Sequence, residues 1–86
     1  EALRINPNYA EAHNNLGIAY AHQRRYQEAI AQFSEALRIN PDYAEAHYNL
    51  GIAYLTMGDS SSAFKEYQIL KKMNPGLANR FYGKTK

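Results

Sequence analysis

The sequence of 86 residues contains no cysteine, no tryptophan, three prolines and five glycines. Without cysteine the chain has no disulfide framework and no thiol nucleophile, which is typical of a reducing compartment. No apolar run approaches the roughly 18–20 residues that span a bilayer, so we expect no membrane partner. No secretory signal opens the sequence. The compartment is therefore unknown from the sequence, and the cytoplasm is the default assumption.

The excess of one charge over the other is also small, because ten basic and eight acidic residues leave a formal net charge of +2. This balance is too weak to indicate a nucleic-acid partner. The segment from Lys71 onward is basic and contains no acidic residue, and we interpret it as a solvated end of the chain. An RNA-binding repeat is the least favoured alternative, because the basic residues form no stripe that could follow a nucleic-acid backbone.

The few prolines are regularly spaced at positions 7, 41 and 75, which are 34 residues apart. Residues 1–20 and 35–54 are identical at 18 of 20 positions at this same offset. Such a period indicates a repeat protein, and we expect it to be a piece of a longer array. The predicted organisation is, in chain order, the end of a preceding unit (1–9), two complete units (10–43 and 44–77) and a partial or capping helix with a basic tail (78–86).

Each unit shows the apolar spacing of two helices. In the first helix, a histidine, a leucine, a glycine and a tyrosine recur at i, i+3, i+4 and i+7, which is one helical face. The breaks before the second helices fall at Gln23–Arg25 and Gly58–Ser60, and we expect Asp59 or Ser60 to be an N-cap. An Asn-Pro pair ends each second helix, because proline cannot continue a helix.

Gly17 and Gly51 occupy equivalent positions inside the first helices, where glycine costs about 1 kcal/mol relative to alanine. Their recurrence predicts that the two helices of a unit approach each other closely at these points. We expect the small side chains of Ala29 and Ala63 to face the two glycines, with large aromatic rings beside the contact.

This pattern resembles the tetratricopeptide repeat, which has 34 residues, a helix-turn-helix and the positions W-x2-L-G-x2-Y, A-x3-F and P. The matching residues are His13, Leu16, Gly17, Tyr20, Ala29, Phe33, Ala36 and Pro41 in the first unit, and His47, Leu50, Gly51, Tyr54, Ala63, Tyr67 and Pro75 in the second. Histidine replaces the usual aromatic residue at the first position of both units. The resemblance implies an all-α fold of antiparallel helix pairs, stacked as a fragment of a right-handed α-solenoid.

The resemblance also implies a concave binding groove that is lined by the first helix of each unit. Carried over by position, the lining residues are Asn14, Asn15, Ile18, Ala21 and His22 in the first unit, and Tyr48, Asn49, Ile52, Leu55 and Thr56 in the second. Asparagine amides can bind a peptide backbone, and the isoleucines offer apolar contact. Some family members clamp a C-terminal carboxylate with Lys, Asn and Arg. The basic partners are missing here, so we expect no preference for an acidic C-terminus.

We expect no catalytic site, no metal site and no cofactor. The polar residues of this sequence recur at equivalent positions in the two units, whereas an active site needs a single cluster of different functional groups. His13 and His47 are one repeat apart, so stacked helices would hold them about 10 Å apart, too far to share a zinc ion. We interpret both histidines as packed rings at an aromatic position.

The function predicted from the sequence is a non-catalytic scaffold for protein–protein interaction, which binds a peptide or helical segment in the groove. The alternative is self-association, as a dimer or as an oligomer that exchanges a helix between chains. The Gln23–Arg25 turn contains weaker turn residues than Gly58–Ser60, so we predict that it is the hinge for such an exchange.

Overall fold

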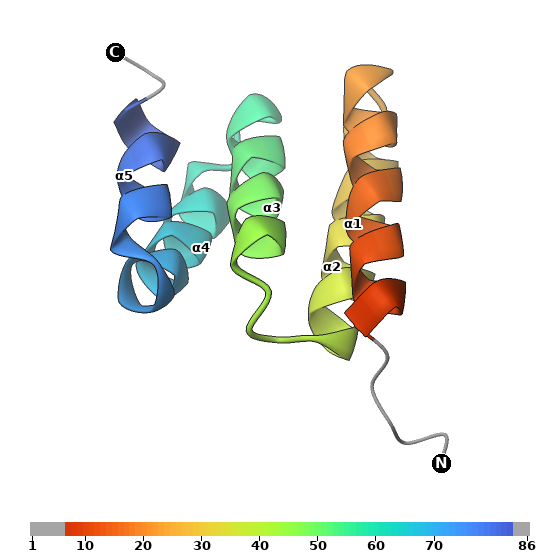
Figure 1. Cartoon of the computed structure of the whole chain (residues 1–86). Coiled ribbons are helices and arrows are strands. Elements are labelled where there is room, and N and C mark those ends of the chain that lie inside the picture. The colour runs from red at the N-terminus through yellow and green to blue at the C-terminus, as the bar shows by residue number, and fades with distance from the viewer. Residues whose placement is uncertain (1–6, 84–86) are drawn as a thin grey trace.

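The computed structural model describes residues 7–83, which form five helices (Figure 1). They are α1 (Pro7–His22), α2 (Tyr26–Ile39), α3 (Ala44–Thr56), α4 (Ser60–Met73) and α5 (Pro75–Gly83). The first helix begins at Pro7, three residues before the expected start of the first unit. The predicted basic tail at residues 84–86 and residues 1–6 of the expected preceding unit lie outside the described residues.

The helices form two layers (Figure 1). Helices α1, α3 and α5 lie side by side in one layer, and α2 and α4 lie behind them. Helix α2 contacts both α1 and α3, and helix α4 contacts both α3 and α5. Each helix therefore packs against the preceding and the following helix, and the predicted all-α solenoid of helix pairs is confirmed.

The turn between α3 and α4 has the backbone of a Schellman motif, in which the residue after the helix has a left-handed conformation. Gly58 has a φ of 85°. The N–H groups of Gly58 and Asp59 donate to the carbonyls of Leu55 and Tyr54, at 3.0 and 2.8 Å. The carboxylate of Asp59 then accepts from the backbone N–H of Ser62 at 3.2 Å, so the predicted N-cap at Asp59 is confirmed.

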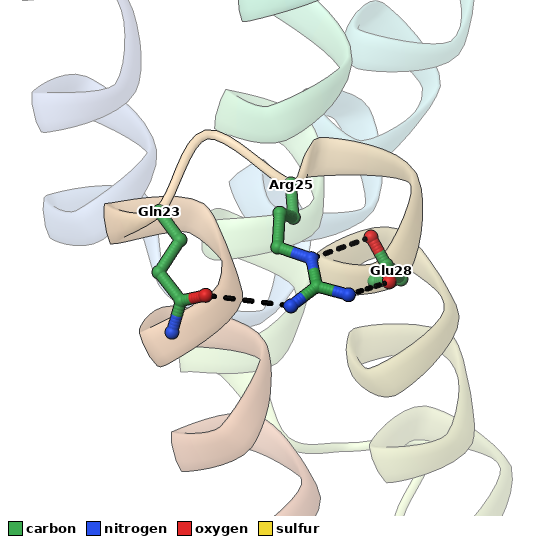
Figure 2. A network of polar contacts seen from close by, with 3 residues as sticks. All are labelled: Gln23, Arg25 and Glu28. Atoms are coloured by element: carbon green, nitrogen blue, oxygen red, sulfur yellow. Dashed lines mark hydrogen bonds and ion pairs between the residues drawn. The ribbon is translucent and has the colours of Figure 1, made fainter.

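The turn between α1 and α2 adopts the same backbone, but its residues favour that conformation less. Arg24 has a φ of 65°, a left-handed conformation that strains a residue with a Cβ atom. Arg25 precedes α2 and makes no side-chain capping bond. Its guanidinium instead lies across the turn, donating to both carboxylate oxygens of Glu28 and, at 3.5 Å, to Gln23 Oε1 (Figure 2). An exposed ion pair thus holds this turn in place of a glycine and a cap.

Packing of α3 onto α2 joins the two units. Leu50 and Ala53 of α3 form one buried cluster with Ala29 and Phe33 of α2. A second cluster consists of three alanines, Ala10 of α1, Ala36 of α2 and Ala46 of α3, each fully buried. Small residues therefore bring three successive helices together at one end, and larger side chains fill the space at the other.

The close approach at Gly17 and Gly51 is real, but rings rather than alanines occupy it. A Cβ atom on Gly17 would lie 2.6 Å from the ring of Phe33, and one on Gly51 would lie 2.6 Å from the ring of Phe81. The expected partner Ala29 instead packs between the units. Each glycine therefore leaves a notch that accepts an aromatic ring.

The short helix α5 covers the end of the second unit. The side chain of Asn74 accepts a hydrogen bond from the backbone N–H of Leu77, which starts the helix beside Pro75. Phe81 of α5 is fully buried, and Ala78 is nearly so. Helix α5 lies where a partial or capping helix is expected, and Phe81 occupies the repeat position of His13 and His47.

Candidate functional site

A hollow of about 260 Å³ opens between α1 and α3. It is lined by Ile18, Ala21 and His22 of α1, by Tyr26 and Phe33 of α2, and by Asn49, Ile52, Ala53 and Thr56 of α3. Ile18 and Ile52, which occupy equivalent positions in the two repeats, line the hollow from α1 and α3, and Tyr26 and Phe33 line it from α2. It is a concave site between two repeats, where elongated repeat proteins offer a binding surface.

The lining of the hollow is mainly apolar and uncharged. Among the described residues around it, none is aspartate, glutamate, lysine or arginine. Ile18 and Ile52 are both partly exposed and supply apolar surface from opposite walls. The hydroxyl of Thr56 donates to the carbonyl of Ile52 at 2.9 Å, so its polarity is used within its own helix. This arrangement suits an apolar group better than a charged one.

The structure brings six of the ten expected groove residues to this hollow: Ile18, Ala21, His22, Asn49, Ile52 and Thr56. The other four are absent from its lining. Asn15 is exposed and Leu55 is partly exposed. Asn14 and Tyr48, which occupy equivalent positions, instead lie where each first helix packs against the next one.

Asn14 is 2% exposed, and its amide oxygen accepts from Asn49 Nδ2 at 3.1 Å. This bond joins α1 to α3 and satisfies a buried polar group, which would otherwise destabilise the fold. Asn49 therefore has two roles, since it lines the hollow and also links the two helices. The side chain of Asn14 is not available to a ligand.

Tyr48 occupies the corresponding place between α3 and α5. Its ring packs edge-on against Phe81, with centroids 5.9 Å apart, and the guanidinium of Arg80 lies 5.8 Å from its centroid. Its hydroxyl is buried and has no hydrogen-bond partner among the described residues. The difference between Asn14 and Tyr48 therefore adapts each helix to its next neighbour.

The two histidines at the aromatic position make equivalent bonds to the second helix of their own unit. His13 Nδ1 lies 2.8 Å from Gln32 Oε1, and His47 Nδ1 lies 2.7 Å from Glu66 Oε1. Both pairs are 19 residues apart. The common offset is visible in the sequence, but we did not predict these pairs, because position alone does not show which polar residue faces the ring.

His47 has a second partner, because its Nε2 lies 2.9 Å from the carbonyl oxygen of Pro41. Both partners are acceptors, so an imidazolium that donates from each nitrogen satisfies them. The hydrogen bond to Glu66 raises the pKa of His47, and this outweighs the lowering effect of burial. The bond to Pro41 and the charge of Asp42 also raise it. Histidine replaces an aromatic ring here because it can tie α3 to α4 and to the preceding loop.

Within residues 7–83, no three His, Asp or Glu side chains lie together in a way that could hold a metal ion. None of the helices in this range is long and apolar enough to cross a bilayer.

Comparison with known proteins gives a consistent result. Family models described as tetratricopeptide or TPR repeats match residues 1–31, 23–58 and 44–76. Among curated proteins, no sequence matches the chain. A crystal structure of MamA superposes with a TM-score of 0.78 and 29% identity, over 93% of this chain. The match covers 50% of MamA, so the chain spans about half the length of that structure. The chain belongs to the tetratricopeptide repeat family.

Proposed function

We propose that the chain is a non-catalytic scaffold that binds a peptide segment in the hollow between α1 and α3. Repeats of this family generally mediate protein–protein interaction. The observation that carries the proposal is the concave, uncharged hollow between Ile18 and Ile52. A pocket of this kind, mostly apolar with a few polar groups, is the usual form of a binding site.

The chemistry of the lining favours a peptide that places an uncharged apolar side chain between Ile18 and Ile52. Asn49 and His22 supply polar atoms at the rim for the peptide backbone. A carboxylate or an ammonium group would lose its hydration there without gaining an opposite charge, which costs several kcal/mol. A charged peptide should therefore bind less well.

The test is an NMR titration of isotope-labelled protein with short peptides that differ only at one central residue, which is Leu, Glu or Lys. We expect the leucine peptide to shift the amide signals around Ile18 and Ile52, and the charged peptides to shift them much less. Ile52→Asn should abolish the response. Leu55→Asn is the matched control, since Leu55 lies on the same helix outside the hollow. Equal responses to all three peptides would refute the proposal.

A second candidate function is self-association, which exposed residues on α1 favour. Leu16 is 44% exposed, whereas its counterpart Leu50 is 4% exposed because α2 covers it. Tyr9, near the start of α1, is 63% exposed. This face of α1 has the composition of a surface that packs against the second helix of another repeat. We propose that a second copy supplies that helix through the part of its α4 that α5 leaves exposed, near Phe64.

Sedimentation over a range of protein concentrations tests this second proposal. We expect a larger species to form as the concentration rises, and Leu16→Glu to keep the chain monomeric. Asn15→Glu is the control, because Asn15 is also exposed on α1 but its counterpart Asn49 is not a buried residue. A chain that stays monomeric at every concentration would rule the second candidate out.

A further inference from the structure

The outer face of α4 differs from the equivalent face of α2 in its residue types, although these side chains are exposed and do not pack between repeats. Counted along the repeat, Lys65, Gln68, Ile69 and Lys72 of α4 correspond to Ala31, Ser34, Glu35 and Arg38 of α2. On α2, the carboxylate of Glu35 forms an ion pair with Arg38. The face of α2 is thus small, polar and internally neutralised.

On α4 the same positions form a hollow of about 360 Å³, lined by Lys65, Gln68, Ile69 and Lys72. Ile69 is 40% exposed and stands where α2 has its glutamate. Lys65 precedes it by four residues and Lys72 follows it by three, so both ammonium groups lie on the same helical face. An apolar side chain flanked by two cations replaces an ion pair.

The positive charge of this face is only partly balanced by nearby carboxylates. Among the ion pairs between described residues, none includes Lys65 or Lys72. The neighbouring carboxylates have other partners, since Glu66 bonds to His47 and Asp59 caps α4. Hydrogen bonds from Ser62 lower the pKa of Asp59, and the charge of Lys65 lowers it further. Asp59 therefore balances part of the charge of Lys65, and Lys72 leaves the surroundings of Ile69 with a net positive charge.

We propose that this face of α4, defined as Lys65, Gln68, Ile69 and Lys72, docks an acidic amphipathic helix of a protein partner. The occupant is a helix because the face is a stripe along a single helix, with its members three to four residues apart. An apolar residue of the partner would pack on Ile69, and its carboxylates would pair with the two lysines. This site is on the opposite layer from the peptide-binding hollow and does not depend on it.

The test uses two synthetic helical peptides that share one leucine stripe, flanked either by glutamates or by glutamines. We expect fluorescence anisotropy to give roughly tenfold tighter binding of the glutamate peptide at low salt, and the preference to shrink as salt screens the charges. Because all four residues are on the surface, a variant with the residues of α2 should fold, and circular dichroism checks this. That variant combines Lys65→Ala, Gln68→Ser, Ile69→Glu and Lys72→Arg, and it should lose the preference.

The chain offers a reciprocal control in α2. Transferring the face to the first unit requires Ala31→Lys, Ser34→Gln, Glu35→Ile and Arg38→Lys. We expect this transfer to create a second binding site for the glutamate peptide. The double change Lys65→Gln and Lys72→Gln, with Ile69 kept, should remove both the preference for the glutamate peptide and its salt dependence, and should leave weak apolar binding of both peptides.

Three results would overturn the proposal. The first is equal affinity for the two peptides, or no binding of either. The second is loss of binding in Ile52→Asn, which would place the peptide in the hollow between α1 and α3. The third is tighter binding to vesicles of anionic lipid than to the glutamate peptide, which would make this face a membrane surface. A failure of the groove proposal leaves these measurements unchanged.

Discussion

Replacing Glu66 by glutamine converts the polar pair of the second unit into the pair of the first unit. His47 and Glu66 are 2.7 Å apart, with side chains 10% and 15% exposed. A hydrogen bond to a charged group contributes roughly 1.5–3 kcal/mol, whereas a neutral one contributes roughly 0.5–1.5. Glutamine keeps a bond to the ring, as Gln32 does with His13. We therefore expect Glu66→Gln to lower the free energy of unfolding by about 1–1.5 kcal/mol near pH 6.

The effect must depend on pH, and the direction of the shift fixes the sign. Glu66 raises the pKa of His47 above its ordinary value of 6.5 in the folded chain. The stabilisation is then complete below the pKa of the unfolded chain and is lost as the pH rises through the higher folded pKa. Wild-type stability should therefore fall between about pH 6.5 and the folded pKa, and this fall should be smaller in Glu66→Gln.

Urea unfolding followed by far-ultraviolet circular dichroism, at about pH 6 and about pH 8.5, measures both quantities. The reciprocal change Gln32→Glu is the control, and it should stabilise the chain near pH 6 and introduce a second decline at higher pH. The reasoning is refuted if Glu66→Gln lowers the free energy of unfolding by the same amount at both pH values. That result would mean that His47 is neutral in the folded chain and that Glu66 acts only through packing.

Three further substitutions follow from the structure, and chemical denaturation measures each. Arg24→Gly should stabilise the chain by about 0.5–1 kcal/mol, because Arg24 has the left-handed backbone that Gly58 adopts without strain; no gain would mean that the ion pair beside it fixes the turn. Tyr48→Phe should be neutral or stabilise by about 1 kcal/mol, since the buried hydroxyl has no partner among the described residues; a clear loss would contradict this. Gly17→Ala should destabilise by about 1–3 kcal/mol, because its methyl group would lie 2.6 Å from the buried ring of Phe33; Gly58→Ala, with nothing within 4 Å, tests conformational strain alone.

The helices and their order could be predicted because the apolar period acts locally. His47, Leu50 and Tyr54 define one face of a helix whatever surrounds it. Gly58 and Asp59 likewise predict a turn and an N-cap, because of the backbone preference of glycine and the capping preference of the aspartate side chain. These signals depend on neighbours in the sequence, so no tertiary contact had to be known.

The details of the candidate site could not be predicted in the same way. Asn14 and Ile18 occupy the same helix, and a repeat pattern does not show that one is buried against α3 while the other lines the hollow. Arg24 has no turn preference, so only its alignment with Gly58 indicates a left-handed residue. Which ring fills each glycine notch depends on packing between distant segments, as the different partners of Gly17 and Gly51 show.

The two glycine notches make the stability of the two helix pairs depend on different neighbours. Phe33 fills the notch at Gly17 from within the same helix pair, so the first pair can complete its own packing. Gly51 is filled by Phe81, which arrives from the following helix. In a linear array with nearest-neighbour coupling, the second pair therefore gains much of its stability only after α5 docks. Release of α5 should be the first opening event in hydrogen exchange, and it should deprotect α3 and α4 before α1 and α2.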